Sequence, residues 1–220
     1  MHGLILIGAP GAGKGTLGDY IHRTWGYEHF SSGDLLRDEV RMGTPIGQKI
    51  RAALKEGGQV EDAIIQEMVF NRLNEMVANK QSFVIDGFPQ TLIQKQSLDA
   101  HANKQPELHL HYITLRVEMD TARLRMENRI SCEKCHAVFS KILFDGQALD
   151  KCGQCQISLT GRESDQGQKA ANRLAFFTQN TGPILDSLFT QSPSLSIDAN
   201  LSPESVFEKM DQIMIQINQV

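Results

Sequence analysis

The sequence predicts an α/β protein in which helices cover both faces of a parallel sheet. Short apolar runs alternate with helical patterns along most of the chain, and the first run leads directly into a glycine-rich loop. The length of 220 residues exceeds the ~150 of a typical domain. The extra length falls in two stretches that break the alternation, so we expect one core with two insertions.

The elements of the core follow from the spacing of apolar residues. Continuous or alternating apolar residues predict strands, and apolar residues three and four apart predict helices. Ser202 and Pro203 suit the cap and the first position of the last helix. In chain order we expect strands at residues 4–7, 83–85, 113–117 and 195–197, and helices at 14–25, 62–77 and 203–217.

The two insertions divide the core into three pieces. Residues 31–60 are rich in helical patterns and contain no strand pattern, whereas residues 129–165 hold all four cysteines and many turn formers. The core then comprises residues 1–30, 61–128 and 166–220.

Composition excludes several classes of protein. With 22 Lys and Arg against 26 Asp and Glu, the net charge is −4, which argues against a protein dedicated to nucleic acid or to anionic membranes. No apolar run approaches the ~18 residues of a membrane span, and no basic segment precedes the apolar start. We expect a cytoplasmic monomer that keeps its thiols reduced and binds neither nucleic acid nor membrane.

A phosphate-binding loop lies between the first strand and the first helix. Residues 8–14, GAPGAGK, fit the P-loop pattern G-x-x-x-x-G-K in the context that the pattern requires. Backbone N–H groups and the helix N-terminus would hold the phosphates, while the lysine reaches the outer ones. The residue after the lysine is glycine, so the hydroxyl comes one position later. The loop predicts binding of a nucleoside triphosphate by Gly11, Ala12, Gly13, Lys14, Gly15 and Thr16.

The cysteines predict a structural zinc site. Cys132-x-x-Cys135 and Cys152-x-x-Cys155 are separated by 16 residues, a spacing typical of four-thiolate zinc sites, which have no open position for catalysis. His136 completes a C-x-x-C-H pattern as in c-type haem attachment. Haem would require export and would leave the second cysteine pair unexplained. A zinc-ribbon module for nucleic acid is a further alternative, which the negative charge disfavours.

The motifs together resemble those of adenylate kinases and their nucleoside monophosphate kinase relatives. GAPGAGKGT is similar to their phosphate loop, SSGDLLR at residues 31–37 and DGFP at 86–89 are similar to two further signatures, and Arg162 with Asp165 stands where their lid ends. The resemblance implies reversible phosphoryl transfer from ATP to AMP, giving two ADP, with Mg²⁺ and no covalent intermediate. It also implies that the first insertion binds the acceptor and that the second is a lid stapled by Zn²⁺.

The resemblance also assigns residues that spacing alone does not distinguish from surface positions. Arg125 and Arg129 are four apart in a helical pattern, so we expect them on one helix face. The implied catalytic residues are Lys14, Asp86, Arg129, Arg162 and Arg173. Besides the phosphate loop, ATP would contact Arg125, Arg129, Val138 and Phe139. AMP would contact Ser32, Arg37, Gly58, Gln59, Val60, Gly87, Phe88, Pro89, Gln90, Gln94, Arg162 and Arg173.

Three positions depart from the family pattern. Gln90 stands in place of an arginine, Ser164 replaces one of two acidic residues, and Ile130 replaces a second arginine after Arg129. These departures leave three hypotheses open: an adenylate kinase, a kinase with another monophosphate acceptor, or a catalytically weak ATP-binding regulator. Retention of the charged residues assigned to catalysis favours an active kinase.

Overall fold

A computed structural model describes residues 1–55, 60–141 and 150–219. Its larger sheet has five strands, β1 (His2–Gly8), β2 (Glu28–Ser31), β3 (Phe83–Asp86), β4 (His109–Arg116) and β8 (Ser196–Asp198). A smaller sheet has three, β5 (Arg129–Ser131), β6 (Val138–Ser140) and β7 (Thr160–Gly161). Within these ranges, none of the helices is long and apolar enough to cross a membrane.

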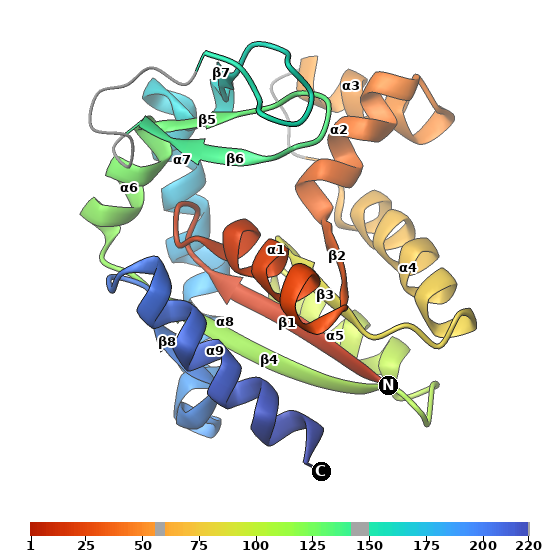
Figure 1. Cartoon of the computed structure of the whole chain (residues 1–220). Helices are drawn as coiled ribbons and strands as arrows, with labels where there is room; N and C mark the ends of the chain where they lie inside the picture. The colour runs from red at the N-terminus through yellow and green to blue at the C-terminus, as the bar shows by residue number, and fades with distance from the viewer. Residues whose placement is uncertain (56–59, 142–149, 220) are drawn as a thin grey trace. The chain divides into compact units, whose positions relative to one another are not determined.

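Helices connect the strands of the larger sheet (Figure 1). They are α1 (Lys14–Trp25), α2 (Ser32–Met42), α3 (Pro45–Lys55), α4 (Asp62–Ala78), α5 (Leu92–Ala102), α6 (Met119–Glu127), α7 (Gly167–Phe176), α8 (Gly182–Gln191) and α9 (Pro203–Asn218). A π-helical turn (Phe177–Thr181) joins α7 to α8, and short 3₁₀ turns (Glu163–Asp165 and Pro193–Leu195) precede α7 and β8.

The five-stranded sheet has the order β2-β3-β1-β4-β8. The pairs β1–β3, β2–β3 and β4–β8 are parallel, with Ile5 opposite Ile85 and Leu115 opposite Ile197. Residues 4–7 and 83–85 are at most 1% exposed, as expected of strands that are covered on both faces. The α/β fold class that the sequence predicts is therefore confirmed.

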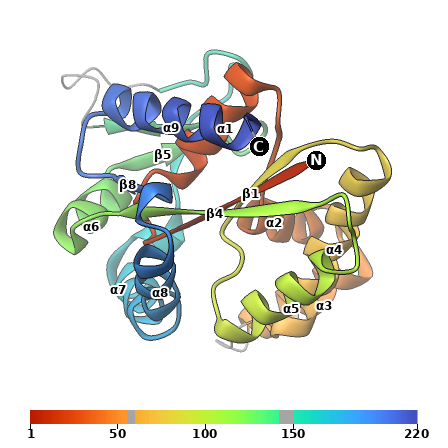
Figure 2. The same ribbon diagram turned by 90° about the horizontal axis from the view of Figure 1, so that it is seen from below.

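The chain forms two compact units. Unit 1 comprises residues 1–7 and 18–113, and unit 2 comprises residues 8–17 and 114–220. In unit 1, α2 packs on α3 and α4 contacts α5 (Figure 2). In unit 2, the phosphate loop belongs with the three-stranded sheet and the helices from α6 onward. The domain boundaries predicted from the sequence remain a prediction.

Capping residues explain where several helices begin and end. Ser202 accepts the backbone N–H of Ser205 at 3.3 Å, and Pro203 follows it as the first helical residue, as the sequence predicts. Gly43 ends α2 in the left-handed conformation (φ 68°) and donates its N–H to the oxygen of Glu39. A residue with a side chain would be strained there.

Two local predictions were wrong. The first insertion was expected to contain no strand, but Ser31 is the last residue of β2 and pairs with Asp86. This strand is short and polar, with only Phe30 buried, so it gives no apolar run. Arg125 and Arg129 do not share a helix face either. Arg125 lies in α6, which ends at Glu127, and Arg129 begins strand β5.

Candidate functional site

The phosphate loop joins β1 to α1, and its residues 8–14 belong to unit 2. Gly11 and Gly13 have positive φ values of 87° and 92°, and a Cβ atom on Gly11 would lie 2.2 Å from the backbone oxygen of Ala122. Glycine at this position is therefore required by both conformation and packing. Lys14 is the first residue of α1, and its Nζ donates to the backbone oxygens of Gly8 at 2.8 Å and Ala9 at 2.9 Å. Ala12 is buried, Gly15 is half-buried and Thr16 is exposed.

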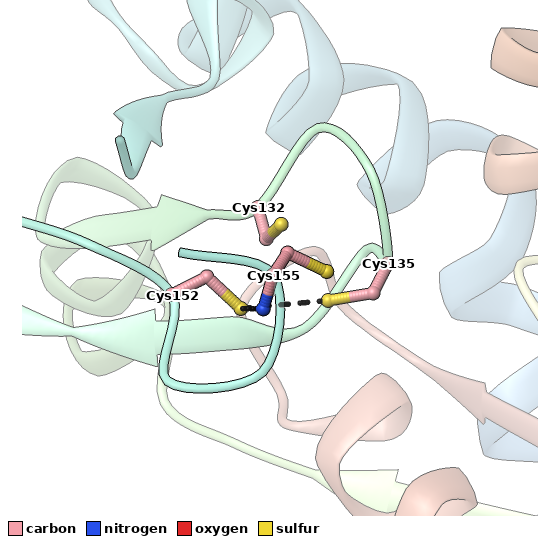
Figure 3. A group of neighbouring side chains, drawn as sticks. All are labelled: Cys132, Cys135, Cys152 and Cys155. Atoms are coloured by element: carbon pink, nitrogen blue, oxygen red, sulfur yellow. Dashed lines mark hydrogen bonds between the residues drawn. The ribbon is translucent and has the colours of Figure 1, made fainter. Parts of the chain in front are cut away.

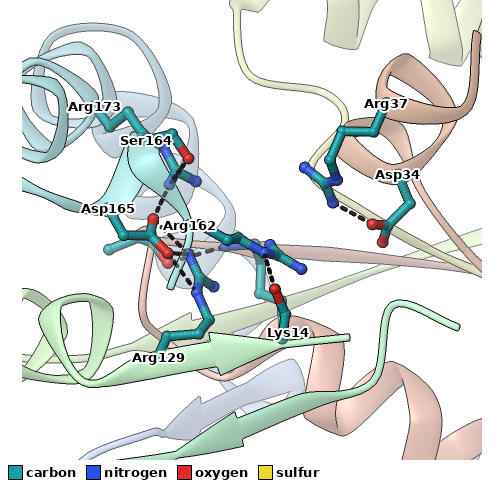
Figure 4. A network of polar contacts seen from close by, with 10 residues as sticks. Lys14, Asp34, Arg37, Arg129, Arg162, Ser164, Asp165 and Arg173 are labelled. Carbon is teal, nitrogen blue, oxygen red and sulfur yellow. Dashed lines mark hydrogen bonds and ion pairs between the residues drawn. The ribbon is translucent and has the colours of Figure 1, made fainter. Parts of the chain in front are cut away.

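Asp165 organises two of the predicted arginines (Figure 4). Its side chain is 1% exposed and accepts two bonds of 2.7 Å from Arg129, one from Nε and one from Nη2. Arg173, on α7, donates to the same carboxylate and also to the hydroxyl of Ser164 at 3.3 Å. The fork geometry with Arg129 fixes the plane of its guanidinium. One buried anion thus holds two cations whose N–H donors number five each.

Arg162 precedes the turn that carries Asp165. Its Nε donates to the hydroxyl of Ser131 in β5 at 3.3 Å, and its backbone oxygen accepts the N–H of Asp165 at 2.9 Å. Lys14, Arg129, Arg162 and Arg173 all belong to unit 2. Together with the carboxylate of Asp165, these four cations carry a net charge of +3. Such an excess suits a polyphosphate.

Arg125 has a different environment from the other arginines. Its Nη1 donates to the backbone oxygen of Ala199 at 2.7 Å, and burial lowers the pKa of the guanidinium below its ordinary value. This contact ties α6 to the segment after β8. Val138 and Phe139 lie in β6, both half-buried.

Except for Arg162 and Arg173, the predicted acceptor residues lie in unit 1, several of them around the turn after β3. Ser32, 2% exposed, donates its hydroxyl to the oxygen of Gly87 at 2.6 Å. Gly87 has a φ of 80°, and a Cβ there would lie 2.8 Å from that hydroxyl. Phe88 is fully buried and meets Phe70 edge to face at 6.1 Å. The side chain of Phe88 therefore stabilises the core, which argues against the predicted contact of this side chain with AMP.

Gln90 and Gln94 form a hydrogen-bonded pair with the same turn. Gln90 donates its side-chain N–H to the oxygen of Gly87 at 2.7 Å and its backbone N–H to Oε1 of Gln94, also at 2.7 Å. Gln94, 2% exposed, donates to Oδ1 of Asp62 at 2.6 Å. The orientation of the Gln94 amide is thus set on both sides. Gln90 is exposed, and its side chain folds back onto the turn.

The remaining predicted residues are placed as follows. Arg37 in α2 is 45% exposed at its side chain and pairs with Asp34 three residues earlier. Asp86 ends β3 and is half-buried. Val60 precedes α4 and is half-buried, whereas Gly58 and Gln59 lie outside the described residues.

The four cysteines converge in unit 2 (Figure 3). Their sulfur atoms all lie within 4.8 Å of one another, and Cys135 Sγ is 3.6 Å from Cys152 Sγ. Backbone N–H groups, that of Cys135 above all, lower the pKa of the Cys132 thiol to about 7. The backbone N–H of Cys155 points at Cys152 Sγ at 3.4 Å. Two C-x-x-C knuckles thus bring four thiols together, an arrangement that is compatible with zinc.

His136 donates its backbone N–H to the oxygen of Cys132 at 3.0 Å, but its ring is not among the ligand atoms of this group. It has a φ of 60° and follows the first knuckle. In the described part of the chain, the potential metal ligands that lie together here are the four cysteines. The cluster thus uses both C-x-x-C pairs, as a zinc site requires and as attachment of haem through the first pair does not.

Comparison with known proteins decides the family. A family model described as adenylate kinase matches residues 6–192. The chain belongs to the adenylate kinase family. As a member, it is assigned the ATP:AMP phosphotransferase activity that the sequence predicts.

Individual adenylate kinases match over most of their length. That of Chlamydia muridarum is 30% identical, with 94% of this chain and 85% of its own length covered. That of Petrotoga mobilis is 30% identical, with 98% of each chain covered. That of Trichlorobacter lovleyi is 36% identical, with 83% of this chain and 85% of its own length covered.

Two contributors to the candidate site were not assigned from the sequence. Asp165 was noted at the end of the lid, but its burial between Arg129 and Arg173 was not foreseen. Asp62 was assigned only to the start of a helix, although it orients Gln94 and also accepts the hydroxyl of Thr91 at 3.1 Å. A lone carboxylate in a turn or a first helical turn carries no local signal of burial or of a distant partner.

Proposed function

We propose that the protein transfers a phosphoryl group directly from ATP to AMP, with each unit supplying one nucleotide site. The observation that carries the proposal is the pair of arginines held by buried Asp165. Phosphoryl transfer demands little covalent chemistry from a protein, because positioning and charge neutralisation provide most of the catalysis. Two guanidiniums fixed before the substrate arrives meet both demands.

On the donor side, the loop of residues 8–14 would hold the ATP phosphates through its backbone N–H groups. Lys14 donates to two loop carbonyls, so its ammonium would exchange these weak partners for phosphate oxygens. Arg129 and Arg173 would donate their other N–H groups to the transferring phosphoryl and thereby offset the charge that accumulates there. Arg162 would add a third guanidinium, and Arg125 would support the donor side through its bond to Ala199.

On the acceptor side, Arg37 would grip the AMP phosphate by exchanging Asp34 for it. This exchange is cheap because the Arg37 side chain is 45% exposed. Gln94 would read the base with the amide orientation that Asp62 sets. Ser32 and the Gly87 turn would line the nucleotide, together with the predicted contacts at residues 58–60.

The reaction would use Mg²⁺ with ATP, because oxygen ligands suit this cation and the predicted site residues include a carboxylate and a hydroxyl. Asp86 would hold the ion or its water shell. When bound, Mg²⁺ screens the phosphate charge and orients the phosphate oxygens. Asp86 ends its strand at the turn that carries Gly87, so its carboxylate is positioned by the sheet.

The four cysteines would hold one structural Zn²⁺. All four ligand positions are thiolates, so the ion leaves no position for a water nucleophile and takes no part in the reaction. It would fix the hairpins between Arg129 and Arg162, and therefore the strands from which these arginines extend. Elemental analysis is expected to find about one zinc per chain. We further infer that the protein is a cytoplasmic monomer, and gel filtration tests its oligomeric state.

One coupled assay tests the proposal. Purified protein is given MgATP with AMP, CMP, UMP or GMP, and diphosphate formation is followed. ADP formation that depends on AMP is expected. Transfer to another acceptor would select a different monophosphate kinase, and tight ATP binding without transfer would select a regulator.

A matched pair of variants tests the arginine pair itself. Arg129→Lys keeps the charge but loses the bidentate geometry, so kcat is expected to fall by about tenfold or more. Arg116→Lys is the control, because Arg116 pairs with exposed Asp186 on the surface. Equal kcat in the two variants would contradict the proposed role.

A further inference from the structure

Ser131 is a polar residue inside the smaller sheet of unit 2. It ends β5, the central strand in the order β6-β5-β7, and pairs with Val138 on one side and Thr160 on the other. Its exposed fraction is 6%. A buried hydroxyl without a hydrogen bond is costly. The bond that Ser131 makes is to a guanidinium, because its hydroxyl accepts the Nε–H of Arg162 at 3.3 Å.

The pleat of β5 explains why this hydroxyl lies beside the predicted arginines. Residues two apart on a strand share a face, so Ser131 lies on the face of β5 that carries Arg129. Ile130, between them, lies on the opposite face and is 6% exposed. Arg129 contacts Asp165 and Ser131 contacts Arg162. One face of a short strand thus contacts both ends of the turn that runs from Arg162 to Asp165.

The backbone that carries the hydroxyl is held by contacts on all sides. The sheet pairs Ser131 with both neighbouring strands. Cys132 follows directly and is 1% exposed; its N–H donates to the oxygen of Ala137 at 2.9 Å, and its oxygen accepts the N–H of His136 at 3.0 Å. The first cysteine knuckle therefore begins at the residue after Ser131. These bonds place the hydroxyl independently of Arg162.

The bond to Ser131 involves the nitrogen of Arg162 that is nearest to the stem of the side chain. A guanidinium has five N–H donors, one on Nε and four on the two Nη atoms. Ser131 accepts the Nε–H, whereas the Nη atoms form the fork that matches two oxygens of a phosphoryl group. A hydroxyl is neutral, so this contact orients the guanidinium without neutralising its charge.

We propose that Ser131 is a positioning residue for phosphoryl transfer: its hydroxyl holds the guanidinium of Arg162 in the orientation that stabilises the transferring phosphoryl. The inference rests on the proposed function, in which Arg162 contacts that group. It adds a residue that touches neither nucleotide and acts through Arg162 alone. Loss of the hydroxyl then lowers kcat rather than raising KM, and it does so only while the arginine is present.

The test is a double-mutant cycle in the full-length protein. Initial rates with MgATP and AMP are compared for the parent, Ser131→Ala, Arg162→Lys and the double variant, and thermal unfolding checks that each is folded. Arg162→Lys keeps the charge but lacks the planar fork. Thr160→Val is the matched control. Thr160 pairs with Ser131 in the sheet, and its hydroxyl donates to Glu133 at 3.2 Å rather than to an arginine.

Ser131→Ala is expected to lower kcat by about three- to tenfold, with the KM for ATP and the KM for AMP changed by less than about twofold. In the Arg162→Lys background the same substitution is expected to change kcat by less than about twofold, as is Thr160→Val in the parent. Equal kcat for Ser131→Ala and Thr160→Val, or an undiminished effect in the Arg162→Lys background, would show that Ser131 contributes only to the sheet. A parent that forms no ADP from ATP and AMP would overturn the proposed function, and the role of Ser131 with it.

Discussion

Asp165→Asn removes one negative charge from the centre of the arginine pair and keeps the shape of the side chain. The amide retains one oxygen for Arg129 or Arg173, but its NH₂ group faces guanidinium donors. The bidentate pair with Arg129 is then lost. We expect both a less stable protein and a slower enzyme.

The size of each effect follows from burial. Removing one partner of a fully buried ion pair costs about 3–5 kcal/mol. Asp165 is 1% exposed, but Arg129 and Arg173 are 18% and 37% exposed, so water recovers part of the loss. We therefore expect a loss of about 2–3 kcal/mol, which lowers Tm by roughly 4–12 °C in a chain of this length. Misplaced guanidiniums are expected to lower kcat by about tenfold to hundredfold.

Glu163→Gln is the matched control for this prediction. Glu163 is in the same 3₁₀ turn, loses the same charge and pairs with exposed Lys169. Its variant is expected to change the free energy of unfolding by less than about 0.5 kcal/mol. Thermal unfolding and initial rates at saturating ATP and AMP give the two readouts. If Asp165→Asn matched Glu163→Gln in both, the reasoning would be refuted. A fall in Tm with unchanged kcat would leave Asp165 a purely structural residue.

Further predictions concern the acceptor, the cysteines and pH. Gln90→Arg adds a charged donor beside Gly87. A charge-assisted hydrogen bond is worth ~1.5–3 kcal/mol, so the KM for AMP is expected to fall by about tenfold to hundredfold. Unchanged kinetics would exclude an acceptor contact at this position. Cys152→Ser is expected to retain less than one zinc per chain in elemental analysis and to have a lower Tm. Burial, with Lys104 nearby, lowers the pKa of His101. Below about pH 6.5 the unfolded chain binds a proton at this residue and the folded chain does not, so the free energy of unfolding decreases as the pH falls. Denaturation experiments at two pH values should show a smaller decrease for His101→Gln than for the parent.

The core strands were predictable from the sequence because burial on both faces leaves a continuous apolar run, and the long helices because their apolar residues recur three and four apart. The run at residues 4–7 and that at 83–85 are such cases, and the observed strands β1 and β3 extend them by one or two residues at an end. β2 was not predictable, because only Phe30 of its residues is buried. The assignment of Arg129 to a helix was wrong. Its spacing of four residues from Arg125 is that of a helix, but the helix ends before Arg129, with Asn128 as its C-cap.

The candidate site was predictable where a motif carries its own geometry. The phosphate loop and the cysteine knuckles are local arrangements, so the sequence predicted their residues by spacing. The bond from Arg129 to Asp165 joins residues 36 positions apart, and the bond from Gln94 to Asp62 joins residues 32 positions apart. Long-range contacts of this kind are set by tertiary packing, and the spacing of residues along one sequence does not predict them.

The three departures from the family pattern fall differently on the two units. In unit 2, Ile130 replaces a cation and Ser164 replaces an anion, so the two changes cancel in charge. Ile130 is 6% exposed and packs in the interior, while the Ser164 hydroxyl still accepts a bond from Arg173. In unit 1, Gln90 removes a cation, and its side chain bonds to the turn. The predicted donor side thus keeps its charge balance. We therefore expect the departures to raise the KM for AMP more than the KM for ATP.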